Sequence, residues 1–118
     1  MDDTRAWEIA LDDHPEFREG FENDSLPEEM LGEDGEPISP RLHLMLHVIV
    51  EQQLAADAPP GIAEIAEQLT KLGVSRHEIR HVIGGPLAEQ LWLMQTQQAA
   101  FDSDAYLDQL REAVDSRR

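Results

Sequence analysis

Residues 40–54, "PRLHLMLHVIVEQQL", decide the fold because they predict a helix that is apolar on almost every side. Such a helix belongs at the centre of a bundle, where neighbouring elements cover it from all directions. The exceptions are His43, His47 and Glu51, which follow one another at four-residue steps. Residues four apart lie one turn apart on the same helix face. We therefore expect a central, buried helix that carries one narrow line of polar side chains.

The rest of the chain is rich in helix-forming residues and nearly free of strand signals. Ser39 and Pro40 fit the cap and first positions of the central helix, which should end near Ala56. Further helices are expected at residues 4–11, 14–21, 60–73 and 75–101, and from Asp102 or Ser103 onward. The predicted fold class is therefore all-α, a small single-domain bundle of five or six helices over residues 1–118.

An acidic segment separates the N-terminal helices, within residues 1–21, from the helical core, residues 40–116. This segment, residues 22–39, reads "ENDSLPEEMLGEDGEPIS" and predicts a long loop. Because it offers little apolar area, we expect weak order and few buried side chains. Its anchors would be Leu26, Met30 and Leu31.

A second break is expected inside the helix that Ser75 opens. Residues 84–86 are Gly-Gly-Pro, and a proline in a helix interior removes a hydrogen bond and clashes with the preceding turn. The sequence therefore predicts that this helix is interrupted or kinked shortly after His81.

Composition limits the classes of protein to which the chain can belong. It has 118 residues and no cysteine, which excludes disulfides and thiolate metal sites. No apolar run approaches the roughly 18 to 20 residues that a membrane span needs. The first residues, "MDDTRAWEIALDDH", are acidic where a secretory signal would be basic and then apolar. These features favour a soluble protein of the cytoplasm.

The formal net charge of −16 argues against binding to nucleic acid or to an anionic membrane, because both require a basic surface. Residues 1–39 hold fourteen Asp and Glu against Arg5 and Arg18, so the charge is concentrated in the N-terminal third. Two interpretations stay open: a solvating surface, or an acidic arm that docks a basic protein partner. A homodimer through an exposed apolar face is also compatible with the composition.

Four of the five histidines form two pairs with the same spacing: His43 with His47, and His77 with His81. Two imidazoles at i and i+4 can bind one metal ion, and Glu51 could join the first pair or orient it. If the two helices face each other, the five residues would form one metal site. Imidazole and carboxylate ligands suit zinc, iron, manganese or nickel. No organic cofactor is indicated, and a metal-free polar stripe is the alternative.

The second pair lies in the string His77-Glu78-Ile79-Arg80-His81, which has the H-E-x-x-H spacing of zinc metalloproteases. In that chemistry Glu78 would be the catalytic general base, and Glu51 is the other candidate for this role. A local explanation competes, because Ser75 and Glu78 fit the S-x-x-E capping box at a helix start. His14 lies among acidic residues in "DDHPEF", and we expect its side chain to be exposed to solvent, with a role as a metal ligand as the alternative.

These residues resemble a known family. The stretches "SPRLHLMLHVIVEQQLAADAPPGI", "LGVSRHEIRHVIG" and "LAEQLW", with "HPEFREGF" upstream, are similar to an uncharacterised bacterial family, domain of unknown function 1841. The resemblance covers roughly residues 7–98. It implies importance for the two histidine pairs and for Glu78, and more weakly for Glu51 and His14. It implies no particular reaction, and Gly-Gly-Pro at 84–86 departs from an uninterrupted helix.

Three hypotheses for function follow from the sequence. The first is a protein that binds a metal ion through two His-x-x-x-His pairs on facing helices. The second is a metal-free helical interaction module whose acidic N-terminal third docks a partner. The third is a metal-dependent hydrolase that uses the string at residues 77–81. Metal analysis of the purified protein would separate the first hypothesis from the second.

Overall fold

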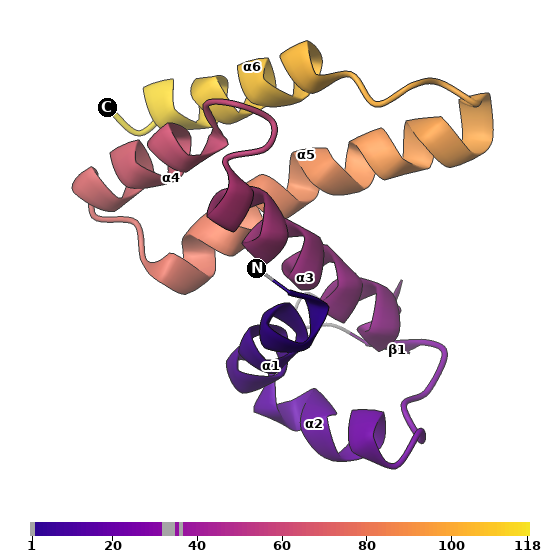
Figure 1. The fold of residues 1–118 in the computed structure, drawn as a ribbon. Helices are drawn as coiled ribbons and strands as arrows, with labels where there is room; N and C mark the ends of the chain where they lie inside the picture. Colours follow the sequence, from indigo (N-terminus) through magenta and orange to yellow (C-terminus); the bar gives the residue numbers. More distant parts are fainter. Residues whose placement is uncertain (1, 32–34, 36) are drawn as a thin grey trace. The chain divides into compact units, whose positions relative to one another are not determined.

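The computed structural model describes residues 2–31, 35 and 37–118, and within these it contains six helices and one pair of short strands (Figure 1). In chain order these elements are α1 (Asp3–Asp13), α2 (Pro15–Glu22), β1 (Met30–Leu31), β2 (Pro37–Ile38), α3 (Pro40–Ala56), α4 (Ile62–Lys71), α5 (Arg76–Gln97) and α6 (Ser103–Asp115). The predicted all-α class and its five or six helices are confirmed. No helix of the described residues is both long and apolar enough to cross a membrane.

The chain divides into two compact units, one up to Gln52 and the other from Gln53 to Arg118, and the division falls within α3. The prediction of a single domain over residues 1–118 stays a prediction. In the first unit, buried side chains from α1, α2 and α3 form one apolar cluster: Ala6, Ala10, Leu11, Phe17, Leu44 and Val48. Trp7 and Phe21 pack against this cluster and stack with ring centroids 5.1 Å apart.

The acidic segment is a loop, as predicted, but it contains a strand pair that the sequence did not reveal. Met30 pairs with Ile38, and Leu31 pairs with Pro37, in antiparallel register. Leu26 and Ile38 pack on the core cluster, whereas Met30 and Leu31 are 38% and 71% exposed. The expectation that Met30 and Leu31 anchor the segment is therefore wrong. Residues 32–34 and 36 of the segment lie outside the described residues.

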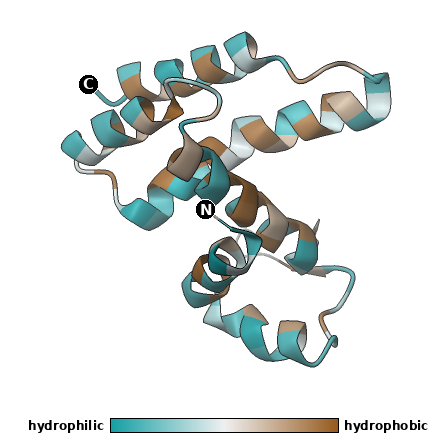
Figure 2. Cartoon of the chain, in the orientation of Figure 1, coloured by the Kyte–Doolittle hydropathy of each residue, from teal (hydrophilic) through white to brown (hydrophobic). Residues whose placement is uncertain are grey.

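Helix α3 begins and ends where the sequence predicted, and the Ser39 hydroxyl oxygen accepts a hydrogen bond from the Leu42 N–H at 3.2 Å. Hydrophobic residues predominate along it, whereas hydrophilic and hydrophobic residues alternate along α4 and α6 (Figure 2). It is not buried all round, because Leu42 and Met45 are 51% and 46% exposed. The polar line is instead the covered one, since His47 and Glu51 are both buried. A polar stripe facing solvent is thus wrong for these two residues.

The second unit is built on the contacts of α4 and α5 with α6 and with each other (Figure 1). Its buried apolar side chains come from all three helices: Ile62, Ile65, Leu69, Ile79, Ile83, Leu87, Leu107, Leu110 and Val114. Tyr106 is fully buried with them, and its hydroxyl donates to Gln53 Oε1 at 2.7 Å. Burial raises the pKa of this hydroxyl well above its ordinary value, so the group stays a protonated hydrogen-bond donor.

Helix α5 continues through Gly84, Gly85 and Pro86, so the predicted interruption is wrong, whereas the alternative of a kink stays a prediction. Ile83 and Leu87 lie on either side of Pro86 in sequence, four residues apart, and both are buried. Their packing holds one helical face against the core. Burial of such side chains stabilises by about 1.5–3 kcal/mol each, enough to offset a proline cost of about 3 kcal/mol. Tertiary packing therefore overrides the local signal of the Gly-Gly-Pro segment.

Candidate metal centre

His14 lies at the sharp turn between α1 and α2. Its backbone N–H closes α1 by donating to the carbonyl oxygens of Ala10 and Leu11, each at 3.1 Å. Pro15 follows as the first residue of α2, and the residue before a proline is disfavoured in helical conformation. His14 accordingly has φ −130° and ψ 65°, outside the helical region. The His-Pro sequence thus ends one helix, starts the next and fixes the imidazole at the turn.

The expectation that the His14 side chain is exposed is wrong, because the residue is only 5% exposed. Its imidazole lies against the two histidines of α3. The ring centroids of His14 and His43 are 4.7 Å apart, those of His14 and His47 4.3 Å, and those of His43 and His47 4.9 Å. Each of these three side chains offers one nitrogen, and these nitrogens lie within 4.8 Å of one another. We refer to His14, His43 and His47 as the histidine triad.

The hydrogen bonds of His14 define where its ring carries the proton. Its Nδ1 lies 3.1 Å from the carbonyl oxygen of Ala10. Since a carbonyl oxygen only accepts, Nδ1 of the neutral ring carries the proton and Nε2 carries a lone pair. This Nε2 lies 2.9 Å from Nε2 of His43. A backbone carbonyl that holds the distal N–H of a histidine is the usual second partner of a metal-binding imidazole.

The phenyl ring of Phe17 lies against the triad. The Phe17 ring stacks on that of His14, with centroids 5.7 Å apart and an interplanar angle of 4°. The same phenyl ring meets His43 edge-on at 6.2 Å. His47 is 5% exposed and His43 is partly buried. Burial lowers the local dielectric and so strengthens the interaction of a cation with its ligands. Packing against the phenyl ring restricts the movement of the imidazoles.

The other predicted site residues come from α3 and α5. Glu51 is buried on α3, one turn beyond His47. His77 and His81 are both on α5 with ring centroids 4.6 Å apart, and both are exposed, as is Glu78. Whether the two pairs share one ion stays a prediction. For His14, the sequence favoured an exposed side chain over a metal ligand. The signal that could have pointed to a ligand is the His-Pro sequence, because it fixes the imidazole at the turn between two helices.

At the start of α5, the backbone N–H of Glu78 takes part in the helix cap. The Ser75 hydroxyl oxygen accepts a hydrogen bond from the Glu78 N–H at 3.1 Å, which caps the helix as predicted.

We expect Ser75→Ala to lower the free energy of unfolding by on the order of 1 kcal/mol. Glu78→Gln should be nearly neutral, because glutamine also completes a capping box. Urea unfolding monitored by circular dichroism measures both changes, and a Glu78→Gln loss larger than that of Ser75→Ala would contradict the capping role.

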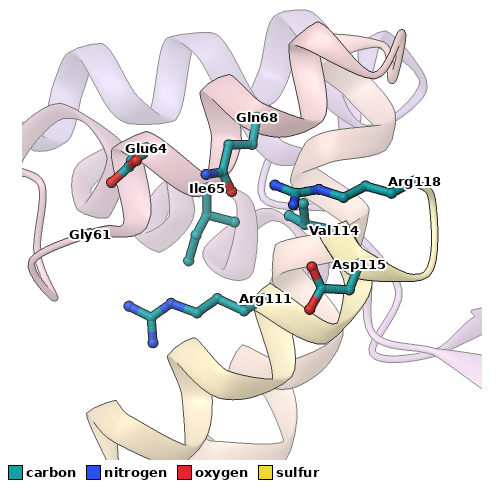
Figure 3. A pocket seen from close by; sticks show the side chains of 8 residues that line it. All are labelled: Gly61, Glu64, Ile65, Gln68, Arg111, Val114, Asp115 and Arg118. Atoms are coloured by element: carbon teal, nitrogen blue, oxygen red, sulfur yellow. The ribbon is translucent and has the colours of Figure 1, made fainter.

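The second unit has a hollow of about 290 Å³ between α4 and α6 (Figure 3). Ile65 and Val114 lie at its centre, and the side chains of Arg111 and Arg118 extend across it. Its charged lining consists of these two arginines with Glu64 and Asp115, and all four residues are exposed. Two charges of each sign give the hollow no net preference for a cation or an anion. The histidine triad is therefore the stronger candidate site.

Comparison with known families matches residues 3–112 to the family described as Domain of unknown function (DUF1841). This match spans nearly the whole chain, so the protein belongs to that family. Neither the curated proteins nor the solved structures gave a significant match. The family carries no assigned activity, and the histidine triad lies entirely within the matched residues.

Proposed function

We propose that this protein binds one divalent metal ion through the histidine triad, and that zinc is the ion it prefers. The observation that carries the proposal is the convergence of His14 Nε2 and His43 Nε2, 2.9 Å apart, with His14 Nδ1 held by Ala10. Two nitrogens bound to one tetrahedral zinc ion, at 2.0–2.1 Å each, lie about 3.3 Å apart. A small ring movement would therefore admit the ion.

The chemistry of the donors supports zinc over the harder ions. All three triad donors are imidazoles, which suit zinc, nickel and iron, whereas manganese favours carboxylate and water ligands. Three histidines are one of the ligand sets that hold zinc in proteins. The strongly acidic chain, at −16, also attracts a cation from solution.

Three protein ligands leave a fourth coordination position. The proposal from the sequence, that the α5 pair His77 and His81 contributes to the same ion, would fill it with an imidazole and make the site structural. A water molecule in this position would instead leave the metal able to act on a substrate. Glu51, which is buried on α3 one turn beyond His47, would then be a candidate general base. The two cases differ in their ligands and so in their spectra.

Titration of the untagged, chelator-treated protein with Zn²⁺, followed by isothermal calorimetry and elemental analysis, tests the proposal. We expect one ion per chain, with a dissociation constant that rises as the pH falls, because protons compete with metal for imidazole nitrogen. Co²⁺ in place of Zn²⁺ should give the visible absorption of a tetrahedral site. Binding of no ion, or weak binding of many ions to the acidic surface, would contradict the proposal.

A further inference from the structure

We propose that the metal ion is a clasp that orders the first unit, so that the fold of α1, α2 and the start of α3 depends on occupancy of the triad. This inference rests on the proposed function and specifies what occupancy would control. The second unit, by contrast, would keep its fold whether or not metal is present. Occupancy of the site would thus switch the order of one part of the chain and leave the other part unchanged.

The first reason is the small size of the first unit's core. The apolar cluster that joins α1, α2 and α3 contains six buried residues in the described chain, and two of them are alanines. Units of about 50 residues bury so little apolar surface that their folding stability is marginal. They are commonly stabilised by a disulfide or a metal ion. The chain contains no cysteine, which removes the first of these solutions. A metal ion held by several side chains is a constraint of the second kind, which its histidines can form.

The second reason is the position of the ligands in the chain. His14 lies at the turn between α1 and α2, while His43 and His47 lie on α3. The residues between them include the acidic segment 22–39, of which no described residue is buried. An ion held by all three imidazoles would close this long loop and fix both N-terminal helices on α3 at once. The loop-closure entropy lost on folding would then be offset by metal–nitrogen bonds instead of by apolar contacts.

The third reason is electrostatic. Residues 1–39 carry fourteen acidic side chains against Arg5 and Arg18, so the compact form of this region is opposed by repulsion between like charges. The ion pairs that relieve it are exposed, as between Arg18 and Asp12 or between Arg41 and Asp24, and such pairs contribute little. A divalent cation bound at the centre of the region would oppose this repulsion directly.

The second unit differs in each of these respects. Nine aliphatic side chains and Tyr106 are buried in it, contributed by three helices that contact one another. Its helices are joined by short connections, and Ser75 and Asp102 cap the starts of α5 and α6 with side-chain hydrogen bonds. Burial on this scale supports folding without a metal ion. The second unit therefore serves as the internal reference when the effect of metal on the first unit is measured in the full-length chain.

Hydrogen–deuterium exchange of the full-length chain, with chelator and with Zn²⁺ at about 100 times its dissociation constant, tests the inference. We expect peptides from α1, α2 and residues 40–52 to exchange up to about 100-fold more slowly when Zn²⁺ is present. Peptides from α4, α5 and α6 should change little. His43→Gln should abolish the difference, and Glu16→Gln, at an exposed position of α2, should preserve it.

The outcomes separate this inference from the proposed function. One Zn²⁺ bound per chain with no change in exchange of residues 3–22 and 40–52 would overturn the clasp and leave metal binding standing. Equal protection of both units would also overturn it, because the effect would then be global. Failure of the chain to bind Zn²⁺ at all would overturn both proposals. A slower exchange confined to the first unit, lost in His43→Gln, is the result the clasp requires.

Discussion

His14→Gln is expected to weaken Zn²⁺ binding by about 100-fold or more, because it removes one of three imidazole ligands from the ion. The glutamine amide retains polarity and similar bulk at this buried turn, so the backbone that closes α1 and starts α2 has no reason to change. Competition against a chromophoric zinc chelator measures the affinity. Helical circular dichroism of the metal-free variant should equal that of the metal-free parent protein.

Two control variants make this result specific. Glu16→Gln changes an exposed residue two positions away and should leave the Zn²⁺ affinity within about twofold, since an exposed charge is screened by solvent. His77→Gln removes an exposed histidine from α5 and tests the site predicted from the sequence. An equal loss in His77→Gln would show that the α5 pair binds the ion as well. Unchanged affinity in His14→Gln would contradict the triad.

Ile83→Ala is expected to cost about 2–5 kcal/mol of unfolding free energy, because this fully buried side chain would leave a cavity in the core of the second unit. The residue also holds α5 against the core next to Gly84, Gly85 and Pro86, where the helix is locally weakest. Its loss should therefore also raise amide exchange around residues 82–88. Urea denaturation at constant Zn²⁺ concentration gives the magnitude.

Trp92→Ala is the matched comparison for this change, because Trp92 lies on the same helix but is 56% exposed. Removal of an exposed side chain away from special features should change stability by no more than about 0.5 kcal/mol. A loss below about 1 kcal/mol for Ile83→Ala, or one no larger than that of Trp92→Ala, would contradict the packing explanation for the continuous helix.

Much of the fold was predictable because its signals are local. Ser39, Ser75 and Asp102 accept hydrogen bonds from the first turns of α3, α5 and α6, and Pro15 starts α2, as their residue types indicate. These features depend on neighbours within about four positions, and a sequence displays them directly.

The failed predictions concern contacts that reach beyond about four neighbouring positions. Nothing near Gly84 or Pro86 reveals that Ile83 and Leu87 are packed firmly enough to keep α5 continuous. Acidic neighbours suggested an exposed His14, whereas its contacts with α3 bury it. The pairing of Met30 with Ile38 joins residues within a segment of loop-like composition. Each outcome is decided by tertiary contacts that composition and periodicity do not encode.

For the candidate site, the spacing of His43 and His47 correctly placed both imidazoles together on one helix face. The partner that the structure supplies within the same unit is His14, which precedes His43 by 29 positions in sequence. The burial of His47 and Glu51 could not be predicted, because a polar line on an apolar helix fits either a covered site or a solvent-facing stripe. Because both residues are buried, the solvent-facing stripe is excluded for them.

X-ray absorption at the zinc edge of the protein loaded with one equivalent of Zn²⁺ tests the central claim most directly. The triad predicts a first shell of nitrogen at about 2.0–2.1 Å with the outer-shell scattering of at least three imidazole rings. His14→Gln should lower the imidazole count by one or abolish the bound zinc. A shell of carboxylate and water oxygens with one imidazole or none would contradict the claim, because the acidic surface and not the histidine triad would then hold the ion.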